Sequence, residues 1–119
     1  QPSMAAYAEQ VVSELHRWLA DLDEIDNTDI DNWHNYKRKL SKICANWLIN
    51  KLSPILTKQN IIFEQLLITP ENFAEFITLI YKNRINSKTA LSLLEKMVQN
   101  GGDPTNILED EGLRLIENV

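Results

Sequence analysis

Residues 100–116 read Asn-Gly-Gly-Asp-Pro-Thr-Asn-Ile-Leu-Glu-Asp-Glu-Gly-Leu-Arg-Leu-Ile, and they contain the signals that decide this fold. The Gly101–Gly102 pair can adopt the left-handed backbone that ends a helix. Asp103 can accept hydrogen bonds from free backbone N–H groups, and Pro104 suits the first position of a helix. Gly112 then stops that helix. The segment predicts a helix that ends near residue 100 and a short helix from residue 104, and none of its residues indicates catalysis.

Apolar residues recur at intervals of three and four along nearly the whole chain of 119 residues, which predicts helices. Sustained alternation of apolar and polar residues, the signal of a strand, is absent. We therefore predict an all-α protein, a small bundle of about five to six helices in two helical subdomains, residues 1–60 and 61–119. The chain begins Gln-Pro-Ser, and few residues follow Gly112, so we expect a fragment of a larger protein, truncated at its C-terminus.

Two long helices are predicted in the first half. One runs from about residue 5 to 22, and its apolar stripe follows helical spacing. The other runs from about residue 31 to 58, with Asp29 or Asp31 as its cap. Pro54 lacks a backbone N–H and crowds the preceding turn, so we expect a kink or break there. The two stripes consist of Met4, Ala8, Val11, Leu15, Trp18 and Leu22, and of Trp33, Tyr36, Leu40, Ile43 and Trp47.

The second half contains clearer helix boundaries. Thr69-Pro70-Glu71 is a typical helix start, and the following helix is expected to reach about Asn83. Asn86 or Ser87 caps the next helix. Residues 61–68 are apolar and fit either a short helix or an extended linker that packs on the core.

The net charge of −5 is distributed unevenly. Residues 1–31 contain eight acids and one base, residues 32–63 contain six bases and no acid, and residues 64–119 contain nine acids and five bases. The basic segment can bind a polyanion on one face. Alternatively, it neutralises the acidic first helix by packing beside it, and charge patterning alone favours this second explanation.

The sequence predicts no catalytic residues, metal ligands or cofactor-binding residues. Cys44 and His34 are the one nucleophile–base pair to consider, but they lie ten residues apart on one predicted helix, about 15 Å along its axis. Cys44 is better explained as a small buried side chain. The glycine pair at residues 101–102 lacks the following Lys-Ser/Thr of a phosphate-binding loop. With one cysteine and no signal peptide or membrane-spanning run, we expect a cytoplasmic protein.

The outer face of the second helix is basic. On a helical wheel, Arg38 and Lys42 lie opposite the aromatic stripe, flanked by Lys37 and Lys39. Ile49 also falls on this outer face, which suggests that part of it contacts protein.

Four motifs in this chain resemble the GatB family, the GatB subunits of the aspartyl/glutamyl-tRNA amidotransferases. They are Lys42-Ile-Cys-Ala-Asn-Trp47, Thr69-Pro70-Glu71, Arg84-Ile-Asn-Ser-Lys-Thr-Ala90 followed by Met97, and Gly101-Gly-Asp-Pro104 followed by Glu111-Gly-Leu113. Their order and spacing match the family from about residue 42 to 116. Ser87 replaces the usual glycine, and Leu91 and Ser92 stand where the family often has Lys and Glu.

The resemblance implies a fold and a function. Residues 1–60 look like the helical domain that follows the catalytic cradle, and residues 61–119 look like the first part of the YqeY-like tail. The parent enzyme resembles an ATP-dependent carbon–nitrogen ligase of three subunits, which uses glutamine-derived ammonia to convert Glu-tRNA(Gln) or Asp-tRNA(Asn) to the amidated form. The resemblance places ATP and Mg²⁺ in the absent cradle, and implies tRNA and subunits A and C as partners. It also implies a cytoplasmic or organellar location, and we expect the fragment itself to be a monomer.

The candidate tRNA contacts are Arg38, Lys42, Arg84 and Lys88. The last three occupy basic positions in the family pattern, whereas Arg38 follows from the helical wheel alone. Such cations contact phosphates and position an RNA without reading its sequence. The alternative is a helical module for subunit assembly with no RNA contact of its own, and a free-standing enzyme is the least favoured interpretation.

Overall fold

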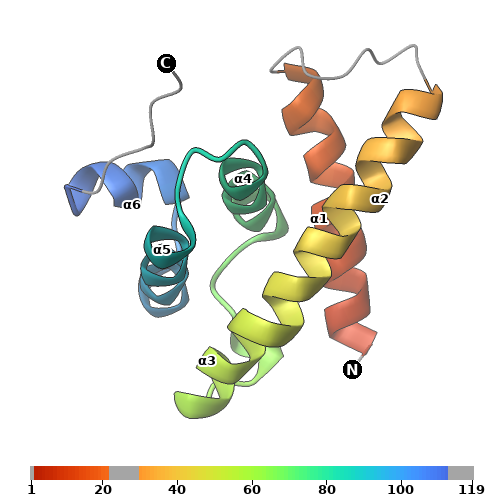
Figure 1. Cartoon of the computed structure of the whole chain (residues 1–119). Coiled ribbons are helices and arrows are strands. Elements are labelled where there is room, and N and C mark those ends of the chain that lie inside the picture. Colours follow the sequence, from red (N-terminus) through yellow and green to blue (C-terminus); the bar gives the residue numbers. More distant parts are fainter. Residues whose placement is uncertain (1, 22–29, 113–119) are drawn as a thin grey trace.

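The computed structural model describes residues 2–21 and 30–112, and every regular element in this part of the chain is helical (Figure 1). The prediction of an all-α protein is therefore confirmed. The elements are α1 (Pro2–Asp21), α2 (Ile30–Trp47), the π-helix η1 (Leu48–Leu52), α3 (Ser53–Lys58), the 3-10 helix η2 (Phe63–Gln65), α4 (Pro70–Tyr81), α5 (Ser87–Asn100) and α6 (Pro104–Asp110). Some sequence predictions concern parts that the structure does not describe: Leu22, Asp29 and Leu113–Ile116 lie outside the described residues, and the side chains of Trp18 and Trp33 are not described.

Helices α2, η1 and α3 form one continuous rod (Figure 1), which widens into a π-helical turn just before the predicted proline. The backbone N–H of Ser53 donates to the carbonyl of Leu48, five residues earlier, which is the hydrogen bond of a π turn. Pro54 then lies in the first turn of α3, where a missing N–H costs little. In place of the expected kink or break, the rod thus has a widened turn before the proline. At the other end of the rod, α2 begins at Ile30, so Asp31 lies inside the helix.

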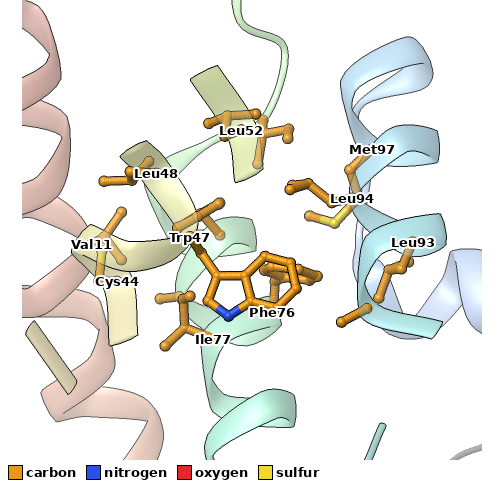
Figure 2. Close-up of a cluster of buried hydrophobic side chains, with 14 of the residues drawn as sticks. Val11, Cys44, Trp47, Leu48, Leu52, Phe76, Ile77, Leu93, Leu94 and Met97 are labelled. Carbon is orange, nitrogen blue, oxygen red and sulfur yellow. The ribbon is translucent and has the colours of Figure 1, made fainter. Parts of the chain in front are cut away.

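One hydrophobic core joins the elements. Helix α1 packs along α4 and against α2, and α5 packs against α4 and α6. In Figure 2 the indole of Trp47 lies beside Phe76, at a ring-centroid distance of 5.4 Å. Fully buried or nearly buried members include Val11, Leu15, Leu40, Cys44, Trp47, Leu48, Leu52, Phe73, Phe76, Ile77, Leu93, Leu94, Met97 and Leu108. The core therefore draws on both sides of residue 60, while the division into two subdomains stays a prediction.

The segment between α3 and α4 combines a short helix with an extended linker, the two possibilities that the sequence left open. Residues 63–65 form one 3-10 turn, and the residues around it are extended. The hydroxyl of Tyr7 on α1 donates to the carbonyl of Ile68 at 2.8 Å, and the Tyr7 ring meets Phe63 edge to face at 5.1 Å. Burial raises the pKa of Tyr7, so this hydroxyl stays a donor. Tyr7 thereby fixes the linker to α1.

The helix boundaries follow the sequence closely. Thr69 accepts from the N–H of Asn72 at 3.1 Å, and Asn86 accepts from the N–H of Thr89 at 2.8 Å, so both predicted caps are present. Asp103 caps α6 by accepting from the N–H groups of residues 105 and 106. Gly101, Gly102 and Gly112 all have positive φ, as the opening segment predicts.

A buried carboxyl joins α6 to α4. Glu75 on α4 is only 7% exposed and accepts a hydrogen bond of 2.6 Å from the hydroxyl of Thr105. Burial raises the pKa of the Glu75 carboxyl. The hydrogen bond from Thr105 opposes this rise, and the carboxylate of Asp103 adds to it. The sequence pattern did not predict burial of Glu75, because the apolar stripe of α4 is defined by its hydrophobic residues whether or not a carboxyl lies beside them.

Candidate nucleic-acid interface

Arg38 and Lys42 lie one turn apart on α2, and both side chains are exposed. Leu40 and Cys44 are buried on the opposite face of α2. Each cation is two residues away from at least one of them, and residues two apart on a helix do not share a face. The predicted outward orientation of both cations is therefore confirmed.

Arg84 lies in the turn between α4 and α5. The turn has the geometry of a Schellman motif, in which Asn83 takes a φ of 56° and the N–H of Arg84 donates to the carbonyl of Leu79 at 2.8 Å. The Arg84 side chain is half-buried. Lys88 is exposed in the first turn of α5, directly after the Asn86 cap. The turn thus presents two cations close together in sequence, next to the N-terminus of a helix.

A pair of tyrosines brings α2 to the end of α4. Tyr36 on α2 and Tyr81 on α4 meet edge to face at a ring-centroid distance of 6.1 Å. Arg38 and Tyr81 line the same surface depression, so Arg38 lies beside the helix end that leads into Arg84. Arg38 is thereby placed beside the end of α4, whereas Lys42 lies one helical turn farther along α2.

The lysines that flank Arg38 face different sides of α2. Lys37 lines a groove of about 600 Å³ between α1 and α2, together with Glu9 and His16. Lys39 lines the depression beside Tyr81 instead. Part of the basic segment therefore faces the acidic first helix, as one interpretation predicted, and part faces solvent beside α4.

Helical spacing predicts that Tyr36 packs in the core and does not stack on a base, and it does not predict the contact between Tyr36 and Tyr81. Both tyrosines are half-buried and pack against the hydrophobic core. The identity of the residue was the available signal, since tyrosine at the edge of an apolar stripe commonly keeps its hydroxyl near water.

The described residues offer little to covalent chemistry. Cys44 is 1% exposed, and burial raises the pKa of its thiol to about 12. His34 is exposed, ten residues away on the same helix. Among residues 2–21 and 30–112, no three His, Cys, Asp or Glu side chains gather as metal ligands. None of the helices in the described ranges combines the length and hydropathy that crossing a membrane needs.

Residues 33–119 match the family described as the GatB domain. The match covers most of the chain, and the chain belongs to this family. It extends from the first turn of α2 through the cap, glycine and proline positions described above.

Several curated relatives carry the name of the B subunit of aspartyl/glutamyl-tRNA(Asn/Gln) amidotransferase. The Oceanobacillus iheyensis protein is 40% identical over 72 residues, which is 60% of this chain and 15% of the relative. The Enterococcus faecalis protein is 36% identical over 73 residues, or 61% and 15%. The Prochlorococcus marinus strain AS9601 protein is 32% identical over 78 residues, or 66% and 16%. The chain thus spans about one sixth of the length of these relatives.

Proposed function

We propose that this chain is the tRNA-binding helical part of the GatB subunit of an aspartyl/glutamyl-tRNA amidotransferase. The proposal rests on exposed Arg38 beside Tyr81 at the end of α4, the helix that leads into the turn with Arg84, in a chain of the GatB family. Exposed cations such as Arg38, Lys42 and Lys88 suit contact with the phosphates of a folded RNA.

The wider setting belongs to the same proposal. The complete enzyme amidates Glu-tRNA(Gln) or Asp-tRNA(Asn) in the cytoplasm, with subunits A and C as partners. It uses ATP, Mg²⁺ and glutamine at sites outside these 119 residues. The role of this chain is to hold the tRNA while that chemistry takes place elsewhere.

The test is binding of transcribed tRNA(Gln) and tRNA(Asn), followed by NMR chemical-shift perturbation at low and moderate salt. Shifts at Arg38, Lys42, Arg84 and Lys88 that fade as salt rises are the expected result. The variants Lys42→Glu and Lys88→Glu should weaken binding, and Lys58→Glu, at an exposed lysine in the last turn of α3, is the charge-matched control. Equal affinities for all three variants would contradict the proposal.

A second candidate function is a protein contact in subunit assembly. The observation that favours it is Ile49, which is 58% exposed on η1, on the outer side of the rod. A large apolar side chain in that position commonly marks contact with protein. Replacing it in the complete GatB protein by Ile49→Asp should then impair assembly with subunits A and C, and intact assembly measured by size-exclusion chromatography would remove this candidate.

A further inference from the structure

The depression between α2 and the end of α4 has a distinct chemical character. It has a volume of about 430 Å³ and is lined by Asn35, Tyr36, Arg38 and Lys39 from α2 and by Tyr81 from α4. That volume falls within the roughly 300–1,000 Å³ range of sites that hold small molecules. Among the residues whose side chains the structure describes, two aromatic rings, two cations and an amide line it.

The two other described hollows differ from it. The groove between α1 and α2 combines Glu9 with Lys37 and has no aromatic lining. The hollow under the α4–α5 turn is lined by Ile80, Ile85, Ala90 and uncharged polar residues. An anionic ligand with a flat aromatic part therefore finds matching groups in the depression beside Tyr81 and not in these two.

We propose that this depression holds one unpaired nucleotide of a bound RNA. The base packs on a tyrosine ring, Arg38 and Lys39 bind the adjoining phosphate, and the Asn35 amide reaches the edge of the base. This inference rests on the proposed tRNA-binding function and adds a nucleotide pocket to it. Unstacked bases in RNA loops are commonly bound by aromatic rings and by arginine, since every base has a π face.

The end of α4 does not prevent phosphate binding there. A helix C-terminus carries partial negative charge on its free carbonyls, which disfavours an anion. Here the carbonyls of Thr78, Leu79 and Ile80 accept from the N–H groups of residues 82, 84 and 83 at 2.8–3.0 Å. Lys82 and Arg84 follow directly, so cations accompany the helix end.

The decisive variant is Tyr36→Leu, which keeps an apolar side chain against the core and removes the aromatic face. Its affinity for tRNA should fall by about 5- to 150-fold, the factor expected for loss of one base–aromatic stack. The salt dependence of binding should stay unchanged, because no charge has been removed. Affinity for a fully paired RNA duplex should also stay unchanged, since paired bases cannot enter the pocket.

A matched pair of lysine variants tests the pocket without touching the core. Lys37 and Lys39 are both exposed on α2, two residues apart, but only Lys39 lines the depression. Lys39→Gln should weaken tRNA binding and reduce the slope of log affinity against log salt by roughly 0.7–0.9. Lys37→Gln should have a clearly smaller effect on both. This pair decides the question if Tyr36→Leu does not fold, which circular dichroism will show.

Adenosine monophosphate distinguishes RNA from a free nucleotide as the source of the ligand. Weak binding at the depression and displacement by tRNA support the proposal, whereas AMP binding as tight as tRNA binding would assign the pocket to a free nucleotide and overturn it. Unchanged tRNA affinity in Tyr36→Leu, or equal effects of Lys37→Gln and Lys39→Gln, would also overturn it. If Lys42→Glu and Lys88→Glu still weaken binding in that case, tRNA binding stands and the nucleotide pocket falls. If the wild-type chain binds no tRNA at low salt, both fall.

Discussion

Replacing Gly101 by alanine should destabilise the protein far more than the usual glycine substitution. Gly101 has φ 68° and ψ −161°, a region that essentially only glycine occupies. A Cβ at this position would also lie 3.2 Å from Cβ of Leu67 and 3.3 Å from its carbonyl oxygen. The substitution therefore combines backbone strain with a clash against the linker that precedes α4.

The magnitude follows from these terms. Backbone strain in this region costs on the order of 1–3 kcal/mol. Overpacking against a backbone that cannot move freely adds about 1–3 kcal/mol. Alanine also lowers the conformational entropy of the unfolded chain, which offsets roughly 0.4–1 kcal/mol of this loss. The free energy of unfolding should fall by about 3 kcal/mol, which lowers the melting temperature of a domain of this size by roughly 12 °C.

Gly112→Ala is the matched control. Gly112 has nearly the same φ, 67°, but a Cβ there would meet nothing within 4 Å. Only the left-handed backbone opposes alanine at that position, so the loss of stability should be about 1 kcal/mol or less. Urea denaturation followed by circular dichroism at 222 nm measures both variants. If Gly101→Ala is no more destabilising than Gly112→Ala, the close approach of residue 101 to Leu67 does not constrain the fold as argued.

Three other perturbations test the packing. Tyr7→Phe removes the hydrogen bond to the Ile68 carbonyl and should lower the free energy of unfolding by about 1–2 kcal/mol in urea denaturation; unchanged stability would show that the linker does not depend on it. Leu94→Ala empties a fully buried site and should cost about 2–5 kcal/mol by the same measurement. Glu75→Gln should raise the melting temperature at pH 8 and have little effect at pH 4. Because burial and the Asp103 carboxylate raise the Glu75 pKa in the folded state, the wild type loses stability as pH rises through that range; equal effects at both pH values would contradict this.

The local features of the fold could be predicted because their causes are local. A cap needs an oxygen-bearing side chain at the start of a helix, and Thr69, Asn86 and Asp103 each bond an N–H two or three residues away. A positive φ favours glycine wherever it occurs, so Gly101 and Gly112 indicated helix ends from the sequence. Pro54 likewise indicated an interruption, although the sequence did not show that a π turn would accommodate it.

The candidate site depended on contacts between distant segments, which periodicity does not encode. The helical wheel predicted that Arg38 and Lys42 lie on the outer face of α2, and both side chains are exposed. It could not show that Tyr36 meets Tyr81, 45 positions away in the sequence, or that this contact brings Arg38 to the end of α4. Asn83, with a φ of 56°, was also missed, because asparagine adopts this conformation less regularly than glycine does.

Helix α1 lies outside the family match, yet it contributes to the packing around the candidate nucleic-acid interface. The match begins at residue 33, after α1, yet Val11 and Leu15 are fully buried in the common core. Lys37 lines its groove together with Glu9 of α1, while Arg38 and Lys39 line the depression on the other side of α2. Lys37 therefore faces the groove beside α1, whereas Arg38 and Lys39 face the depression beside Tyr81 of α4. Helix α2 thus presents cations on two of its sides, one beside Glu9 of the first helix and one beside Tyr81, and a sequence match that begins after α1 does not distinguish the two.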